Sequence, residues 1–340
     1  MHGTLLLILP LQNGGHSKLT IIYDIVLLVI GLLLVCKGGD YFVDSSVDIA
    51  RALGIPRIVI GGTIVSIATT TPELTVSAMA SWMGDSGIAI GNAVGSAIAN
   101  IGLIVGCVAC ITPVSVDEGD FRRRSYWMIV SAILVVVFSW TRYLNPLLGA
   151  VLLLISAAYL FVDYWNIRQR KLNRTEGETQ DPETERVSTK SIVMFAIGIA
   201  MVIFGSRLLV TSGVSLATAL GIPSVIIGLS IVAVGTSLPE LVTGVTAARK
   251  GVPDLSIGNI VGANVLNLAL IIGASSLIHP LSLSYFTQWY SFPWLFIFVT
   301  AMVLMFRGGN LVGKKGGVAL LILYALYILG LVVIPSVMDI

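Results

Sequence analysis

Two stretches with the same pattern decide the fold of this chain: Thr69-Thr70-Thr71-Pro72-Glu73-Leu74 and Thr236-Ser237-Leu238-Pro239-Glu240-Leu241. They lie 167 positions apart (236 minus 69), and the same offset relates the Leu-Gly-Ile-Pro segments at 53–56 and 220–223. Further along, the offset relates Gly91-Asn92 to Gly258-Asn259, Gly95 to Gly262, and Asn100 to Asn267. A constant offset without a gap indicates an internal duplication.

Composition predicts the environment of the duplicated chain. Of 340 residues, 56% are hydrophobic and only 11% are charged, and the mean hydropathy is +0.95. Soluble domains carry about 25% charged residues, so the composition predicts an all-α integral membrane protein whose surroundings are the lipid bilayer. The net charge of +2 does not indicate the strongly basic surface that is typical of nucleic-acid-binding proteins. The three cysteines are an odd number and all lie in apolar runs, and the three histidines lie near predicted span ends or loops, which argues against a disulfide framework or a zinc site.

Apolar stretches long enough to cross a bilayer divide the chain into ten predicted spans. Their limits are 21–50, 57–81, 87–112, 125–141, 144–165, 191–217, 224–248, 255–278, 289–306 and 317–335. Residues 1–20 are predicted to be an external extension or a signal segment, although a basic region ahead of the apolar run is missing. Residues 166–190 mix acids and bases with almost no apolar residues, which predicts a cytoplasmic linker between the halves 21–165 and 191–340.

Basic residues predict how the halves are oriented. Every Lys/Arg cluster follows an odd-numbered span, so the positive-inside rule predicts that both termini lie outside. Five spans per half is an odd number, so the second half enters the membrane from the opposite side. The prediction is ten transmembrane helices in two inverted five-helix repeats. Secondary transporters commonly have this architecture, with a binding site at the midplane between the repeats.

The repeated Pro-Glu pair carries the predicted chemistry. A carboxylate at bilayer depth is costly and suggests a functional site, and here it occurs twice, as Glu73 and Glu240. Pro72 and Pro239 lack an N–H, so carbonyls one turn earlier lose their helical partners. Freed carbonyls in a membrane need another partner. A bound cation is one such partner, and threonine hydroxyls or water are the alternative.

Helical spacing gathers further oxygens around the two carboxylates. The first face is formed by Ser66, Thr69, Thr70 and Glu73, and its counterpart is formed by Ala233, Thr236, Ser237 and Glu240. In the following helices, polar residues recur every four positions as Asn92, Ser96 and Asn100, with counterparts Asn259, Ala263 and Asn267. Packing between helices is the alternative interpretation, and it stays open for Asn92 and Asn259. An all-oxygen set suits a hard cation such as Ca²⁺, and several Na⁺ could occupy the same oxygens instead.

These segments resemble the α-repeats of the calcium/cation antiporter superfamily, specifically the prokaryotic Na⁺/Ca²⁺ exchanger branch. Residues 235–240 match the G-T-S-L-P-E motif completely, residues 68–73 are a variant of it, and G-N-x-x-G-x-x-x-x-N follows each. The G-N-x-x-E motif typical of proton/calcium exchangers is absent from the sequence. The resemblance implies one Ca²⁺ site flanked by Na⁺ sites, no cofactor, and spans one and six that slide against the rest. A prokaryotic plasma membrane is the location it implies.

The resemblance also implies a role for each position. Glu73, Glu240 and the carbonyls of Thr69 and Thr236 would bind Ca²⁺. Na⁺ ligands would include Thr70, Ser237, Ser96 and the backbone oxygens of Ser66 and Ala233, with Asn100 and Asn267 at the central site. Ser66 replaces the usual alanine, a change that keeps the backbone carbonyl, while Ala263 replaces the usual serine, and the missing hydroxyl leaves a three-to-one Na⁺:Ca²⁺ stoichiometry open. Asn267, where K⁺-dependent relatives have aspartate, argues against K⁺ co-transport.

Three other functions compete with Na⁺/Ca²⁺ antiport. A proton could drive Ca²⁺ exchange if a glutamate cycles its proton. A cation channel could use the same acidic residues, although the inverted repeat weighs against it. An intramembrane hydrolase is disfavoured because the sequence contains no H-E-x-x-H and its histidines are poorly placed for a catalytic base.

Overall fold

The computed structural model describes residues 18–53, 61–174, 187–219, 230, 232–307 and 311–338. Most of the predicted extension 1–20 and the central part of the predicted linker 166–190 lie outside these residues. The same holds for nearly all of the two Leu-Gly-Ile-Pro segments and for the beginnings of predicted spans 57–81 and 224–248. Within the described part the chain is almost entirely helical, which confirms the all-α prediction.

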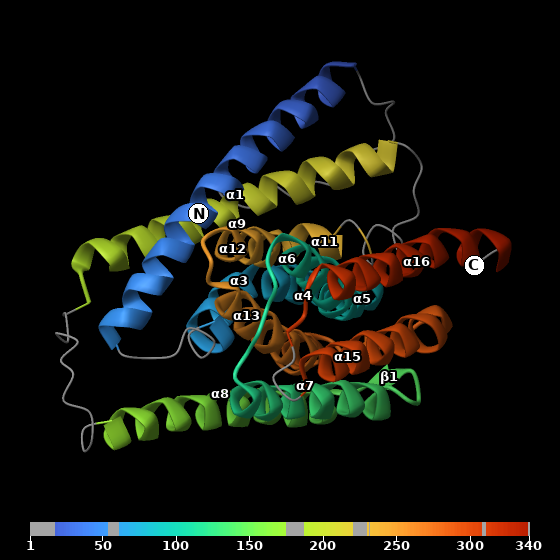
Figure 1. Cartoon of the computed structure of the whole chain (residues 1–340). Helices are drawn as coiled ribbons and strands as arrows, with labels where there is room; N and C mark the ends of the chain where they lie inside the picture. Colours follow the sequence, from blue (N-terminus) through green and yellow to red (C-terminus); the bar gives the residue numbers. More distant parts are fainter. Residues whose placement is uncertain are drawn as a thin grey trace, which may run out of the picture.

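Two long helices form one layer of the molecule. Helices α1 (Lys18–Leu53) and α9 (Thr189–Ala219) lie side by side at one edge of the bundle (Figure 1). Ser215 donates a hydrogen bond to Asp24 at 2.8 Å, and Ser191 donates one to Asp48 at 3.4 Å. Contacts in this order along the two helices require antiparallel packing. Gly38 permits the close approach, since a Cβ there would lie 2.8 Å from the Gly198 carbonyl oxygen.

Two continuous helical stretches form the centre. The first contains α5 (Ser86–Ala99), η2 (Asn100–Val105) and α6 (Gly106–Ile111). The second contains α13 (Pro253–Val265), η4 (Leu266–Ile271) and α14 (Ile272–Ile278). Residues 89–102 and 255–269 are buried without interruption. Both η2 and η4 are π-helical turns, which widen each helix at nearly equivalent positions, and such turns are frequent at functional sites.

The two motif helices are broken immediately before their prolines. The first half has the π-turn η1 (Gly61–Val65), then α3 (Ser66–Thr69) and α4 (Thr71–Trp82), with the interruption at Thr70. In the second half, α11 (Ala233–Thr236) and α12 (Leu238–Arg249) are interrupted at Ser237. Proline at the second position of a helix needs no N–H donor and has a suitable φ, so each half-helix starts again there. The predicted interruption by proline is confirmed.

The remaining helices surround this centre. They are α7 (Glu118–Phe138), α8 (Pro146–Arg174), the short π-turn η5 (Thr287–Ser291), α15 (Phe292–Phe306) and α16 (Lys314–Met338). In Figure 1, α8 lies along the edge of the bundle opposite α1. Two-residue strands β1 (Tyr143–Leu144) and β2 (Leu281–Ser282) pair antiparallel, and an isolated bridge joins Val114 to Val312. These short β contacts connect the halves outside the helices.

The outer faces of the helices are apolar. Leu147 and Leu154 on α8 are 75% and 69% exposed, while Trp82 and Trp289 are 74% and 69% exposed. Exposed aliphatic residues suit a lipid surface, and tryptophan is enriched where lipid meets water. Five helical stretches of the described chain are long and apolar enough to cross a membrane: Ser86–Ile111, Pro146–Asn166, Pro253–Ile278, Thr287–Phe306 and Lys314–Ile334. The protein is therefore an all-α membrane protein.

Candidate cation site

Four buried polar side chains lie on central elements of the two halves that pack against each other, since α4 contacts η4 and α12 contacts η2. Glu73 and Glu240 lie in the first turns of α4 and α12, and both are 0% exposed. Asn100 begins η2, and Asn267 lies in η4. The N-terminus of a helix stabilises negative charge in its first turn. The breaks before Pro72 and Pro239 therefore place both carboxylates at helix ends that stabilise their charged forms.

Each carboxylate lies beside hydroxyls of the other half. Ser237 donates a hydrogen bond to Glu73 Oε1 at 3.2 Å. On the opposite side, Thr69 and Thr70 approach the carboxylate of Glu240. Since Ser237 caps α12 and Glu240 lies in the first turn of that helix, both carboxylates are near the same end of α12. Two negative charges in a buried site repel each other, so a bound cation or a proton is needed to offset their charge.

Six buried oxygens on these packed elements lack a hydrogen-bond partner among the described residues. They are Thr70 Oγ1, Glu73 Oε2, Asn100 Oδ1, Asn267 Oδ1, and Oε1 and Oε2 of Glu240. Leaving buried polar atoms unpaired is costly, so native proteins rarely do so without a reason. The six atoms are oxygens that can coordinate a metal ion, and they come from both halves. A hard cation bound between the halves would satisfy them.

Asparagine side chains hold the motif threonines across the interface between the halves. Thr236 donates a hydrogen bond to Asn92 Oδ1 at 2.9 Å, and Thr69 donates one to Asn259 Oδ1 at 3.2 Å. The amide nitrogen of Asn92 donates to Ser77 at 2.9 Å. Both polar atoms of Asn92 are thus occupied within the protein. For Asn92 and Asn259, the structure favours a positioning role over direct contact with an ion.

The two flanks of the carboxylate pair are not equivalent. On one flank, the Ser96 hydroxyl lies 3.2 Å from the carbonyl oxygen of Ala233, to which it donates, and 3.4 Å from Thr236 Oγ1. On the other flank, Ala263 occupies the position equivalent to Ser96 and has no hydroxyl. There the hydroxyl belongs to Ser66, which donates to the Asn259 carbonyl oxygen at 3.0 Å. The two flanks therefore differ in which helix carries the serine.

Asn264 is a residue of the site that the sequence did not single out. Its Oδ1 accepts a hydrogen bond from Asn100 Nδ2 at 2.9 Å, and its Nδ2 donates to the Ala97 carbonyl oxygen at 3.3 Å. The first bond orients the Asn100 amide and leaves Asn100 Oδ1 without a partner among the described residues. The repeat gives no signal for Asn264, because its counterpart in the first half is Ala97. The signal that the sequence does contain is an amide side chain within an apolar stretch.

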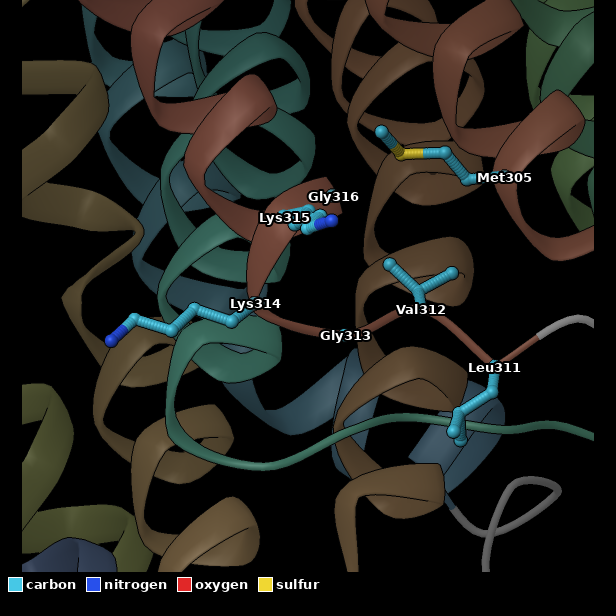
Figure 2. A pocket seen from close by; sticks show the side chains of 7 residues that line it. All are labelled: Met305, Leu311, Val312, Gly313, Lys314, Lys315 and Gly316. Carbon is cyan, nitrogen blue, oxygen red and sulfur yellow. The ribbon is translucent and has the colours of Figure 1, made fainter.

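The donor set limits which ion could bind. No group of three or more His, Cys, Asp or Glu side chains gathers anywhere in the described ranges. The site instead has two carboxylates among neutral oxygens, which suits Ca²⁺ or Na⁺ better than a soft metal. A surface hollow of about 440 Å³ at the start of α16 is lined by Met305 and residues 311–316, including Lys314 and Lys315 (Figure 2). It contains no carboxylate and is no candidate for a cation.

Comparison with known proteins agrees with this geometry. A family model described as "Sodium/calcium exchanger protein" matches residues 23–165 and 190–333. The sodium/calcium exchanger MaX1 of Methanosarcina acetivorans is 34% identical over 90% of this chain and 97% of its own length. The inner membrane protein YrbG of Escherichia coli is 34% identical over 75% of this chain and 79% of its own length.

Solved structures show the same fold. A structure of the sodium-calcium exchanger NCX_Mj soaked with Na⁺ and Sr²⁺ superimposes with a TM-score of 0.78 at 31% identity, covering 91% of this chain and 99% of that one. Another, soaked with Na⁺ and Ca²⁺, gives a TM-score of 0.75 and covers 91% and 98%. Fold and site together define a membrane transporter of the exchanger class, not an enzyme. The chain belongs to the sodium/calcium exchanger family.

Proposed function

We propose that this chain exchanges Na⁺ for Ca²⁺ across the membrane by alternating access. The observation that carries the proposal is the set of six buried oxygens around Glu73 and Glu240 that lack partners among the described residues. One Ca²⁺ neutralises two carboxylates, and calcium accepts about six to eight oxygen ligands in flexible geometry. The relatives named as sodium/calcium exchangers support the same pair of ions.

The proposed ligands follow the predicted set. Glu73, Glu240 and the carbonyl oxygens of Thr69 and Thr236 bind Ca²⁺. Na⁺ occupies flanking sites with oxygens from Thr70, Ser237, Ser96, Ser66 and Ala233, and Asn100 and Asn267 line the central site. Since the two kinds of ion use the same carboxylates, they exclude each other. A carrier that reorients only when these charges are neutralised must then exchange one ion for the other.

The proposed architecture is two inverted repeats of five spans, 21–165 and 191–340, joined by the linker 166–190. Contacts that exchange under the 167-residue offset support it. When each residue is replaced by its equivalent in the other half, the Thr69–Asn259 bond corresponds to the observed bond between Thr236 and Asn92. In the same way, the Asp24–Ser215 bond corresponds to the observed bond between Ser191 and Asp48. A twofold axis between the halves requires such pairs. With this arrangement both termini lie outside a prokaryotic inner membrane, in keeping with the name of the relative YrbG.

Proton coupling is the second candidate. The closely placed carboxylates favour it, because protonation of one glutamate would relieve their repulsion as a cation does. In that case Glu73 and Glu240 would carry protons instead of alternating between Ca²⁺ and Na⁺. The residues of the site are the same under both proposals, so only transport can separate them.

The deciding experiment measures uptake of radiolabelled Ca²⁺ into proteoliposomes loaded with Na⁺, with choline, or with choline plus a pH gradient. Na⁺/Ca²⁺ exchange predicts uptake only with internal Na⁺. Uptake driven by the pH gradient without Na⁺ would overturn Na⁺ coupling in favour of protons. Unitary currents in planar bilayers with ion flux far above carrier rates would overturn both antiport proposals and identify the protein as a channel.

A further inference from the structure

A second buried polar cluster lies outside the cation site, between α7 and α8. Arg124 is 1% exposed, and its Nη2 lies 2.7 Å from Asp163 Oδ2. Arg123 contacts the same aspartate at 3.5 Å and also lies 3.1 Å from Asp120. The Arg124 Nη1 donates a hydrogen bond to the Tyr159 hydroxyl at 3.4 Å. A buried ion pair costs desolvation and often adds little stability, so its retention suggests a specific structural task.

The cluster reaches the segment that leads into the cation site. The Tyr159 hydroxyl donates a hydrogen bond to the Gly62 carbonyl oxygen at 2.8 Å. Gly62 belongs to η1, which runs directly into Ser66 and Thr69. A Cβ at Gly62 would collide with the Arg124 guanidinium, so the arginine lies directly against this turn.

The other side of η1 rests on α13. A Cβ at Gly262 would lie 2.5 Å from the Gly62 carbonyl oxygen and 2.9 Å from its Cα. The Ser66 hydroxyl adds its bond to the Asn259 carbonyl oxygen at 3.0 Å. The turn is therefore enclosed between α13 and the cluster on α7 and α8, with little space to move while these contacts persist.

The sequence of the second half lacks the side chains of this cluster at the equivalent positions. At the 167-residue offset, Ser291, Leu326 and Gly330 stand where Arg124, Tyr159 and Asp163 stand in the first half. A serine, a leucine and a glycine cannot form an ion pair. Like Asn264, the cluster departs from the internal repeat.

We propose that Tyr159, Arg124 and Asp163 form a positioning cluster that fixes η1 and thereby the oxygens of Ser66 and Thr69 at the cation site. Tyr159 is the residue that transmits the effect, since its hydroxyl connects the arginine to the Gly62 carbonyl oxygen. The inference rests on the proposed function, because it assumes that those oxygens bind the transported ions. It predicts that loosening the cluster weakens ion binding without removing any ligand.

The test compares Tyr159→Phe with the wild-type chain in full-length, reconstituted protein. Phenylalanine keeps the ring and removes only the hydroxyl, so folding should be retained. We expect the half-saturating Ca²⁺ concentration for Na⁺-dependent uptake to rise about three- to tenfold, the effect of one lost hydrogen bond. The maximal rate should change less than about twofold, and equilibrium Ca²⁺ binding to the purified protein should weaken by the same factor as uptake.

Tyr290→Phe is the matched control. It removes a tyrosine hydroxyl that donates to the Tyr327 carbonyl oxygen at 2.6 Å, in the second half and away from η1. We expect its half-saturating Ca²⁺ concentration to equal that of the wild type. An unchanged value for Tyr159→Phe, or an equal shift in both variants, overturns the positioning role while the wild-type exchange stands. Absence of Na⁺-dependent uptake in the wild type would instead overturn the proposed function.

Discussion

Glu73 and Glu240 combine burial, repeated occurrence and incomplete hydrogen bonding. Each begins a half-helix after a proline, and the charge of one acts on the other. Three of their four carboxylate oxygens lack a partner in the described part of the chain. Such a pair is unfavourable when empty and charged, and it becomes favourable when a cation is bound. Substitutions of single residues therefore test the proposed cation site most directly.

Replacing Glu240 by glutamine should abolish Ca²⁺ uptake and leave the fold intact. The amide keeps the shape of the side chain but removes one of two charges that bind the ion. Removing one partner of a buried charge interaction costs about 2–5 kcal/mol, or roughly thirtyfold or more in affinity. Radiolabelled Ca²⁺ uptake and thermal unfolding in detergent measure the two effects. Glu118→Gln, the same change at an exposed position on α7, is the control and should transport normally. Normal uptake by Glu240→Gln would remove this residue from the site.

Ala263→Ser tests the difference between the two flanks. Serine would restore a hydroxyl at the position equivalent to Ser96, and an added oxygen ligand should strengthen Na⁺ binding. We expect a lower half-saturating Na⁺ concentration and a steeper Na⁺ dependence of Ca²⁺ uptake. Ser96→Ala should raise the half-saturating Na⁺ concentration and make the Na⁺ dependence less steep. Identical Na⁺ curves for all three proteins would mean that neither hydroxyl contacts Na⁺.

At the scale of elements, breaks and widened turns create the site. The motif helices stop at Thr70 and Ser237, and the central helices widen into η2 and η4 at Asn100 and Asn267. Both features release backbone groups from regular helical hydrogen bonding. Such irregularity is tolerated in a membrane only where it is buried in protein or lines a cavity. Close contact between η1 and α13 keeps this irregular backbone enclosed.

Gly262→Ala should destabilise the protein through that contact. A methyl group would have to displace the backbone of Gly62, and overpacking of this kind costs about 1–3 kcal/mol. Thermal unfolding in detergent should therefore shift to lower temperature. Gly313→Ala is the control, since nothing lies within 4 Å of a Cβ there. Equal unfolding temperatures for both variants would contradict the tight packing of η1 on α13.

At the scale of the whole molecule, α1 and α9 pack against each other as a unit that contacts α12 of the bundle. Lys250, just after α12, contacts Asp44 on α1 at 2.6 Å and Asp40 at 3.8 Å. These exposed ion pairs contribute little stability and are screened by salt, so they can break and form again. Gly39 is the glycine of α1 that faces α12, where a Cβ would collide with the side chain of Val242. Under the proposed alternating access, α1 and α9 move against the remaining helices.

Cross-linking α1 to α12 should therefore stop transport. The variant carries Asp44→Cys and Lys250→Cys in a background without Cys36, Cys107 and Cys110, and a cleavable thiol-specific linker joins the two new thiols. We expect Ca²⁺ uptake to fall to background and to return after reduction of the linker. Each single-cysteine variant treated with the same reagent is the control. Full transport while the cross-link is intact would show that α1 need not move relative to α12.

Local patterns in the chain determined a good part of this protein. Apolar runs and sparse charge indicated a helical membrane protein, and the 167-residue offset with its Pro-Glu pairs indicated a duplication and two buried carboxylates. These properties could be read because bilayer partitioning and helix interruption depend on residues within one or two turns. The breaks at Thr70 and Ser237 follow directly from the prolines beside them.

Tertiary structure alone decided how the halves meet. The bonds from Thr69 to Asn259 and from Asn100 to Asn264 join residues more than 160 positions apart, and no local pattern predicts such pairing. The same is true of the contact between Tyr159 and Gly62, which joins α8 to η1. Hydrogen-bond partners depend on distance and direction between packed helices. The apolar runs in the sequence do not determine these distances and directions, which arise only when the helices pack together.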